Sequence, residues 1–179
     1  MSVLKIVLTG GECTGKTTLA RVLAERHDTA WVPEAAREVA LARPGVLGPE
    51  DVPAIARTHM RLADEAFLAA EEAGRKIVFL DQDLLSTVVY SRHYYGRCPV
   101  WIERIAAERR GDLYLLCHPD LPWLADGVRD RPEARAELHT LFAAALADAG
   151  ARVAEIAGRG AEREARAAAA VVELLERPV

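Results

Sequence analysis

The sequence predicts an α/β fold in which a parallel sheet of five strands is covered by helices on both faces. Short β-branched apolar runs alternate along the chain with longer segments that have helical spacing, and strands separated by helices usually pair in parallel. The length points the same way. A chain of 179 residues, 51% of them hydrophobic, has the size of one domain and can bury a single core. We therefore expect one domain over residues 1–179.

Five runs have the composition of buried strands, and the segments between them have the composition of helices. The strands are expected at residues 2–9, 29–33, 76–80, 112–117 and 151–156. The helices are expected at 16–27, 51–73, 81–96 and 99–110, from 132 onward, and over 161–176. The last of these is alanine-rich like a coiled-coil arm, but its apolar spacing is short and irregular, which favours a helix packed on the domain.

Charge and cysteine content exclude several classes of protein. The formal net charge is −4, so nothing indicates a nucleic-acid-binding surface. No apolar run approaches the roughly 18 residues that span a bilayer, and the apolar start is too short for a signal peptide. Cys13, Cys98 and Cys117 are odd in number and lack metal-ligand spacing, which fits a reducing compartment. We expect a cytoplasmic protein without nucleic-acid or membrane partners; the sequence leaves the number of subunits open.

The segment GGECTGKT, residues 10–17, satisfies the pattern G-x-x-x-x-G-K-[ST] between a predicted strand and a predicted helix. Backbone N–H groups of such a loop, with the positive end of the helix, can surround a triphosphate without steric obstruction. Lys16 would reach the terminal phosphates and the Thr17 hydroxyl would bind Mg²⁺. The sequence thus predicts a P-loop NTPase fold that uses ATP and Mg²⁺. The expected nucleotide-binding residues in this loop are Gly10, Gly11, Glu12, Cys13, Thr14, Gly15, Lys16, Thr17 and Thr18.

Acidic side chains follow two of the predicted strands, at the edge of a parallel sheet where ligands bind. Asp81 fits the carboxylate that holds Mg²⁺ in phosphoryl-transfer sites, with a strand-end cap as the alternative. Asp83 suits a substrate contact or a helix N-cap equally. Glu34 is the candidate general base for an acceptor hydroxyl, the alternative being a first-turn residue that stabilises a helix dipole. Arg37, one turn later, would pair with Glu34, bind a phosphate, or lie in solvent.

A loop at about 118–132 follows the fourth strand and carries Arg129 and Arg131. Guanidinium groups on a closing lid neutralise charge on a phosphoryl group in transfer and exclude water. We expect Arg129 to be catalytic and Arg131 to contact the nucleotide; solvated surface arginines, here and at Arg135, are the alternative. Aromatic side chains would suit a flat acceptor, although core packing also explains them. The expected substrate residues are Glu34, Arg37, Asp83, Tyr90, Trp123 and Asp126.

Four segments together resemble the ribosylnicotinamide kinase domain of the bacterial NadR-type enzymes and related small P-loop ATPases. They are TGGECTGKTTLARVLAE, WVPEAARE, FLDQDLLSTVVYSRHYYGRCPVWI and DLYLLCHPDLPWLADGVRDRPEAR. The resemblance implies a kinase that moves the γ-phosphate of ATP to the 5′-hydroxyl of nicotinamide riboside. It carries over Lys16 and Thr17 as phosphate and metal residues, Glu34 and Asp81 as carboxylates of the site, and Arg129 as the lid arginine.

The sequence also departs from the family pattern. Asp81-Gln82-Asp83 stands where the family commonly has Asp-Thr-Asp, and the 179 residues contain neither the adenylyltransferase domain nor the helix-turn-helix of NadR-type proteins. Two alternatives to the implied activity therefore stay open. One is a kinase of another nucleoside, nucleotide or polynucleotide 5′-hydroxyl, and the other is a P-loop ATPase that acts as a switch. A switch needs neither Glu34 nor an arginine-bearing lid, which favours a kinase.

Overall fold

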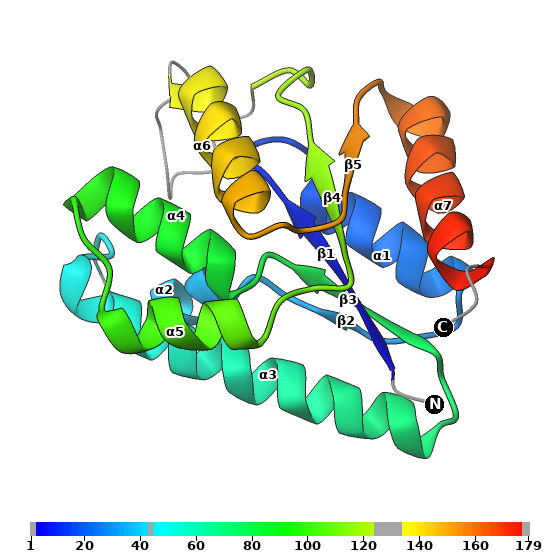
Figure 1. Ribbon diagram of the computed structural model, residues 1–179, viewed down its shortest axis with the longest axis horizontal. Helices are drawn as coiled ribbons and strands as arrows, with labels where there is room; N and C mark the ends of the chain where they lie inside the picture. Colours follow the sequence, from blue (N-terminus) through cyan, green and yellow to red (C-terminus); the bar gives the residue numbers. More distant parts are fainter. Residues whose placement is uncertain (1–2, 43–44, 124–133, 177–179) are drawn as a thin grey trace.

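The computed structural model describes residues 3–42, 45–123 and 134–176 (Figure 1). Its strands are β1 (Leu4–Thr9), β2 (Trp31–Val32), β3 (Ile77–Asp81), β4 (Leu113–Cys117) and β5 (Val153–Ile156). They form one sheet in the order β2-β3-β1-β4-β5. Every neighbouring pair is parallel, so the strands' carboxyl ends share one edge. The five-stranded parallel sheet predicted from the sequence is therefore confirmed.

Helices cover both faces of this sheet, as predicted (Figure 1). They are α1 (Lys16–Arg26), α2 (Ala35–Ala42), α3 (Val52–Glu72), α4 (Leu84–Tyr95), α5 (Val100–Glu108), α6 (Arg135–Asp148) and α7 (Gly160–Glu176), with a 3₁₀ turn at Pro49–Asp51 before α3. Helices α1 and α7 pack on one face, and α3 and α6 pack on the other. Helix α5 packs against α3 and α4 at the side of the domain.

The alternation of side chains along β1 shows why both faces need cover. Ile6 and Leu8 belong to the core shared with α1 and α7, whereas Val7 between them belongs to the core shared with α3 and α6. Successive side chains of a strand point to opposite faces, and all three here are completely buried. A continuous apolar run in a short strand is the pattern that a parallel sheet covered on both faces requires.

Among the described helices, α2 is absent from the ranges expected from the sequence, although the alternative interpretation of Glu34 as a first-turn residue implies a helix here. It has eight residues and follows directly on β2, which is only two residues long. Of its residues only Ala35 and Ala36 are buried, and Leu41 is 89% exposed. Such a short helix with a small buried face gives no sustained apolar period. In the part of the chain that the structure describes, no helix is long and apolar enough to cross a membrane.

Candidate functional site

The P-loop connects β1 to α1 at the carboxyl edge of the sheet, and its glycines meet a steric need there. Gly10 has φ 126°, and a Cβ atom at this position would lie 2.8 Å from the carbonyl oxygen of Cys117 in β4. Gly15 has φ 76° and forms the N-cap of α1. These are conformations that residues with a Cβ atom rarely adopt. The loop therefore approaches the neighbouring strand closely because glycine stands at its first position.

Lys16 lies folded over this loop. Its Nζ donates a hydrogen bond to the carbonyl oxygen of Gly11 at 2.6 Å and another to Oγ1 of Thr14 at 3.3 Å. Thr14 Oγ1 in turn donates to the same Gly11 oxygen at 2.9 Å. The ammonium group is thus held at the loop, where it adds a full positive charge to the partial charge of the helix N-terminus.

Thr17 and Asp81 come together from α1 and β3, as a magnesium site requires. Thr17 Oγ1 donates to Asp81 Oδ2 at 2.5 Å, and the other carboxylate oxygen, Oδ1, is buried without a hydrogen-bond partner among the described residues. Burial raises the pKa of Asp81; the Lys16 ammonium lowers it and the Glu34 carboxylate raises it further. A buried carboxylate with one oxygen lacking a hydrogen-bond partner among the described residues, beside a hydroxyl, is an oxygen donor set of the kind Mg²⁺ prefers. These residues fit the ion.

Glu34 and Arg37 form an ion pair at the start of α2. Arg37 Nε donates to Glu34 Oε2 at 3.1 Å, with the Arg37 side chain 51% exposed and the Glu34 side chain 10% exposed. The backbone N–H of Arg37 also donates to the Glu34 carbonyl oxygen, so Glu34 immediately precedes the first turn of the helix. Arg37 thus makes the ion pair with Glu34 that is one of its three interpretations. Its contact with a phosphate stays a prediction.

Asp83 has the geometry of a helix N-cap. Its Oδ1 accepts hydrogen bonds from the backbone N–H of Ser86 at 3.0 Å and from the Ser86 hydroxyl at 3.3 Å. Its Oδ2 accepts from the hydroxyl of Tyr114, in β4, at 2.7 Å. Burial and the neighbouring Asp83 charge raise the pKa of Tyr114, so the phenol stays a donor. Both carboxylate oxygens accept hydrogen bonds within the domain, as the cap interpretation expects. The contact of Asp83 with a substrate stays a prediction.

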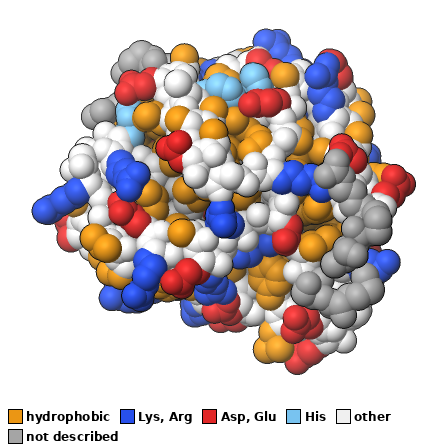
Figure 2. All heavy atoms as spheres, in the orientation of Figure 1, with side chains coloured by type: hydrophobic (Ala, Val, Ile, Leu, Met, Phe, Trp, Pro, Cys, Tyr) orange, Lys and Arg blue, Asp and Glu red, His pale blue; other side chains and the backbone are white. Residues whose placement is uncertain are grey.

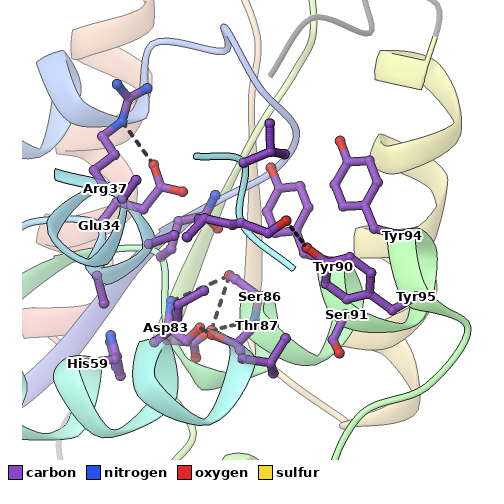
Figure 3. A pocket seen from close by; sticks show the side chains of 18 of the residues that line it. Glu34, Arg37, His59, Asp83, Ser86, Thr87, Tyr90, Ser91, Tyr94 and Tyr95 are labelled. Atoms are coloured by element: carbon purple, nitrogen blue, oxygen red, sulfur yellow. Dashed lines mark hydrogen bonds and ion pairs between the residues drawn. The ribbon is translucent and has the colours of Figure 1, made fainter. Parts of the chain in front are cut away.

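A cavity of about 610 Å³ lies beside the P-loop, between α2, α3 and α4. Figure 3 shows Glu34 and Arg37 on one side of it, the tyrosines of α4 on the other, and His59 and Asp83 at its lower border in this view. Its apolar lining includes Leu41, Val46, Leu47, Val52 and Ile55. The cavity reaches the P-loop through Tyr90, whose hydroxyl donates to the carbonyl oxygen of Gly10 at 3.4 Å. A molecule in this cavity would lie next to the phosphate cradle.

The tyrosines of α4 are fixed by their hydroxyl groups. The rings of Tyr90 and Tyr94 are nearly parallel, with an interplanar angle of 3° and centroids 6.0 Å apart. The Tyr94 hydroxyl donates to Oε1 of Glu12 in the P-loop at 2.9 Å, and the Tyr95 hydroxyl donates to the carbonyl oxygen of Leu47 at 2.8 Å. These contacts hold an aromatic wall in place. Tyr90, an expected substrate residue, lines the cavity; its contact with a substrate stays a prediction.

Trp123 lies elsewhere. It is not among the described residues that line the cavity; instead the Arg135 guanidinium lies over its ring at 5.8 Å from the centroid. The same guanidinium donates to the carbonyl oxygens of Cys13 at 3.1 Å and Leu121 at 3.0 Å. Trp123 therefore belongs to the surroundings of the P-loop and not to the cavity wall. Asp126, Arg129 and Arg131 lie outside the described residues.

Two residues of this region escaped the sequence analysis. The first is His59 of α3, which lines the cavity and is 6% exposed. Burial lowers its pKa to about 4, so the imidazole is neutral at pH 7 and offers one donor and one acceptor. A single histidine within an apolar helical pattern gives no signal of its own, because core packing explains it equally well.

The second is Arg163 of α7, which hydrogen-bonds the backbone of the P-loop. Its guanidinium donates to the carbonyl oxygens of Thr14 at 2.6 Å and His118 at 3.2 Å, and to Oδ1 of Asp120 at 2.8 Å. Burial opposes the charged form of Asp120, but the Gly158 N–H and the Arg163 charge hold its pKa below the usual value. In the sequence Arg163 is one of several arginines in an alanine-rich helix, which conceals its role.

The fold and the cradle together define a P-loop nucleotide-binding protein. The AAA domain family model matches residues 5–163, and the chain belongs to this family. It is also similar to the trifunctional NAD biosynthesis/regulator protein NadR. The identity is 31% over 128 residues, for NadR of Escherichia coli K12 and for NadR of Salmonella typhimurium LT2 alike. The match covers 69% of this chain and 30% of each relative, so it spans less than a third of the length of these proteins.

Solved structures show the same fold. A NadR protein in complex with NR superimposes with a TM-score of 0.81 at 24% identity, covering 99% of this chain and 51% of that one. A NadR protein with NAD and AMP-PNP gives 0.78 at 23% identity over the same shares. Thymidylate kinase from Ehrlichia chaffeensis gives 0.68 at 14% identity, covering 99% of this chain and 100% of that enzyme. The expected P-loop NTPase fold is thereby confirmed.

Proposed function

We propose that the chain is an ATP-dependent kinase that transfers the γ-phosphoryl group of ATP to the 5′-hydroxyl of a ribosyl compound, first of all nicotinamide riboside. The observation that carries the proposal is the cavity of about 610 Å³, which adjoins the P-loop and has the Glu34 carboxylate on its wall. Similarity to NadR, which includes a structure with NR, supports this acceptor.

The charges around the cavity suit a cationic nucleoside. Glu34 and Asp83 bring two carboxylates to the lining, while Arg37 is the one lysine or arginine among the described lining residues and is paired with Glu34. The pyridinium ring of nicotinamide riboside carries a positive charge. Carboxylates and the face of a tyrosine such as Tyr90 attract such a ring, and the neutral imidazole of His59 does not repel it.

The P-loop side of the site holds the donor. When bound, ATP supplies the phosphoryl group and Mg²⁺ neutralises charge on its phosphate oxygens. The backbone N–H groups of the loop and the Lys16 ammonium would bind the phosphates, and the Thr17 hydroxyl and Asp81 carboxylate would hold the ion. On binding, Lys16 would exchange its contacts with Gly11 and Thr14 for the phosphates, and Thr17 and Asp81 would exchange their hydrogen bond for the ion.

The cavity side prepares the acceptor. Glu34 takes the proton of the 5′-hydroxyl as its oxygen attacks the γ-phosphorus and the bond to ADP breaks. Arg37 orients the carboxylate through its 3.1 Å ion pair. We assign Arg129, on sequence grounds, to neutralise charge on the phosphoryl group in transfer.

A phosphorylated acceptor is the competing possibility, given the fold that the chain shares with thymidylate kinase. The phosphate of a nucleotide acceptor needs cationic partners. Arg37 alone offers one among the described lining residues, and Glu34 already engages it. The described part of the cavity therefore favours an unphosphorylated acceptor.

The test is an ADP-release assay with ATP or GTP as donor and with nicotinamide riboside, uridine, thymidine, thymidine monophosphate or a 5′-hydroxyl oligonucleotide as acceptor. We expect slow hydrolysis alone and rapid transfer to nicotinamide riboside. Lys16→Ala is the control for nonspecific turnover. Preference for the nucleotide or the oligonucleotide would replace the proposed acceptor, and hydrolysis that no acceptor accelerates would identify a P-loop ATPase that is not a kinase.

A further inference from the structure

A second group of polar side chains lies toward the β5 edge of the sheet, away from the cavity. His118 follows β4 directly, His139 is on α6, and Glu155 is on β5. His118 Nε2 lies 2.6 Å from Glu155 Oε2, and His139 Nε2 lies 3.9 Å from the same oxygen. The two imidazole rings are 4.5 Å apart between centroids. None of the three takes part in the proposed phosphoryl transfer.

The sheet register explains why these residues meet. Leu116 in β4 pairs with Glu155 in β5, so both side chains project on the same face. Residues two positions apart along an extended strand point to the same face. His118, two residues after Leu116, therefore lies on that face as well. The same face carries the core that contains Leu116 and Leu138 of α6, and His139 is the next residue of that helix. Three separate elements therefore deliver one side chain each to one point.

The donor atoms have the chemistry of a transition-metal site. Two imidazole nitrogens and one carboxylate oxygen are typical zinc ligands, whereas Mg²⁺ and Ca²⁺ prefer oxygen alone. All three donor atoms lie within 4.8 Å of one another, and no other such group of three occurs among the described His, Cys, Asp and Glu residues. Bonds of about 2.0–2.1 Å in tetrahedral geometry place donor atoms roughly 3.4 Å apart. Small side-chain rotations from the observed distances reach that spacing.

The three side chains are also accessible from solvent. The side chains of His118, His139 and Glu155 are 35%, 20% and 54% exposed, so an ion can reach them from solvent and a water molecule can complete the coordination. Figure 2 shows histidine atoms beside acidic atoms at the upper border of the face in view.

We propose that His118, His139 and Glu155 form a site for one divalent cation of the imidazole-binding class, with Zn²⁺ as the ion that fits best. Such an ion would fasten α6 to the ends of β4 and β5. The carbonyl oxygen of His118 accepts from Arg163, which also donates to Thr14 of the P-loop. The first residue of α6, Arg135, donates to Cys13 of the same loop. The ion would therefore fasten α6, which carries Arg135, to the end of β4, where the His118 carbonyl oxygen contacts Arg163.

The test is calorimetric titration of the full chain with Zn²⁺, in an Asp81→Asn background that weakens the oxygen-rich magnesium site. We expect one Zn²⁺ per chain. Loss of even an outer-shell partner costs about 10- to 100-fold in metal affinity, so His118→Ala and His139→Ala should each weaken binding by at least about 10-fold. The matched control is His93→Ala. His93 is another partly buried histidine beside a glutamate, 3.6 Å from Glu137, and its removal should change the affinity by less than about twofold.

Cobalt provides a second readout that is independent of affinity. Co²⁺ at this site should give the intense visible bands of a tetrahedral ion, and the conservative variant His139→Gln should abolish them while circular dichroism shows an intact fold. Zn²⁺ binding that survives both histidine substitutions, or no uptake by the folded protein, would leave His118 and Glu155 as an ordinary surface ion pair and overturn the proposal. Neither result bears on the kinase activity, which rests on other residues.

Discussion

The P-loop and the acceptor cavity are neighbours that share the contact of Tyr90 with Gly10, yet they are built in different ways. The P-loop is a backbone structure: its glycines allow the chain to approach β4, and Arg163 and Arg135 hold its carbonyl groups from outside. The cavity is a side-chain structure made by α2, α3 and α4. A backbone cradle fits any triphosphate, because every nucleotide presents the same phosphates. A cavity lined by side chains can change its acceptor while the cradle stays the same.

The largest expected effect distinguishes the role of Glu34 in the cavity from the role of Asp81 beside the P-loop. Glu34→Gln should lower kcat by about 10²- to 10⁴-fold, the usual contribution of a positioned base, and leave Mg-ATP binding unchanged. Asp81→Asn is the matched variant and should weaken the apparent affinity for Mg²⁺, so that extra Mg²⁺ restores part of the rate. The measurement is a Mg²⁺ titration of both variants in a transfer assay. If Mg²⁺ rescues Glu34→Gln and leaves Asp81→Asn inactive, the two roles are reversed.

The next effect concerns the support of the cradle. Arg163→Met should lower the free energy of unfolding by about 3 kcal/mol. It removes the donor to Asp120 Oδ1 and to the carbonyl oxygens of Thr14, His118 and Gly158. Arg166 on the same helix is the control: it forms an exposed pair with Glu162, and Arg166→Met should cost less than about 0.5 kcal/mol. Urea denaturation of both variants measures the difference. Equal stabilities would show that the cradle does not depend on α7.

The third effect is a pH dependence that comes from the cavity. The His59 pKa falls from 6.5 to about 4 on folding, so between these values the unfolded chain binds a proton that the folded chain refuses. Stability therefore decreases as the pH falls from about 6.5 to 4. This term amounts to about 2 kcal/mol between pH 7 and pH 5. His59→Gln should lose that part of the pH dependence, as denaturation at the two pH values will show; identical slopes in both proteins would contradict it.

The smallest effect sharpens the assignment of the cavity to the acceptor. If His59 hydrogen-bonds the acceptor, His59→Gln should raise KM for nicotinamide riboside by roughly 10-fold, the value of one neutral hydrogen bond of about 1.4 kcal/mol. The affinity for Mg-ATP should not change, because His59 lies on α3, away from the cradle. A weaker nucleotide affinity with an unchanged KM would mean that His59 supports the fold only.

The difference between the contiguous P-loop and the cavity, whose side chains come from several helices, also decides how far the site can be predicted from sequence. Lys16, Thr17 and Asp81 are foreseeable because the P-loop pattern is contiguous and a parallel sheet places strand ends beside it. His59 and Arg163 acquire their roles only when α3 and α7 pack against distant elements. Asp83 left two interpretations open, because its partner Tyr114 is 31 residues away. The helix α2 was missed since its eight residues bury two alanines.

The hydrogen bonds of Tyr114 have a consequence for motion. The Gly111 N–H donates to the Tyr114 hydroxyl, which donates to Asp83, and Asp83 in turn caps α4. This chain ties the tyrosine wall of the cavity to the central sheet, whereas α2 on the opposite wall buries only Ala35 and Ala36. Segments with few buried contacts open at low free energy. In hydrogen exchange the amides of α4 should therefore exchange late and those of α2 early. We expect an acceptor to enter the cavity on the α2 side and to bind against the rigid tyrosines of α4.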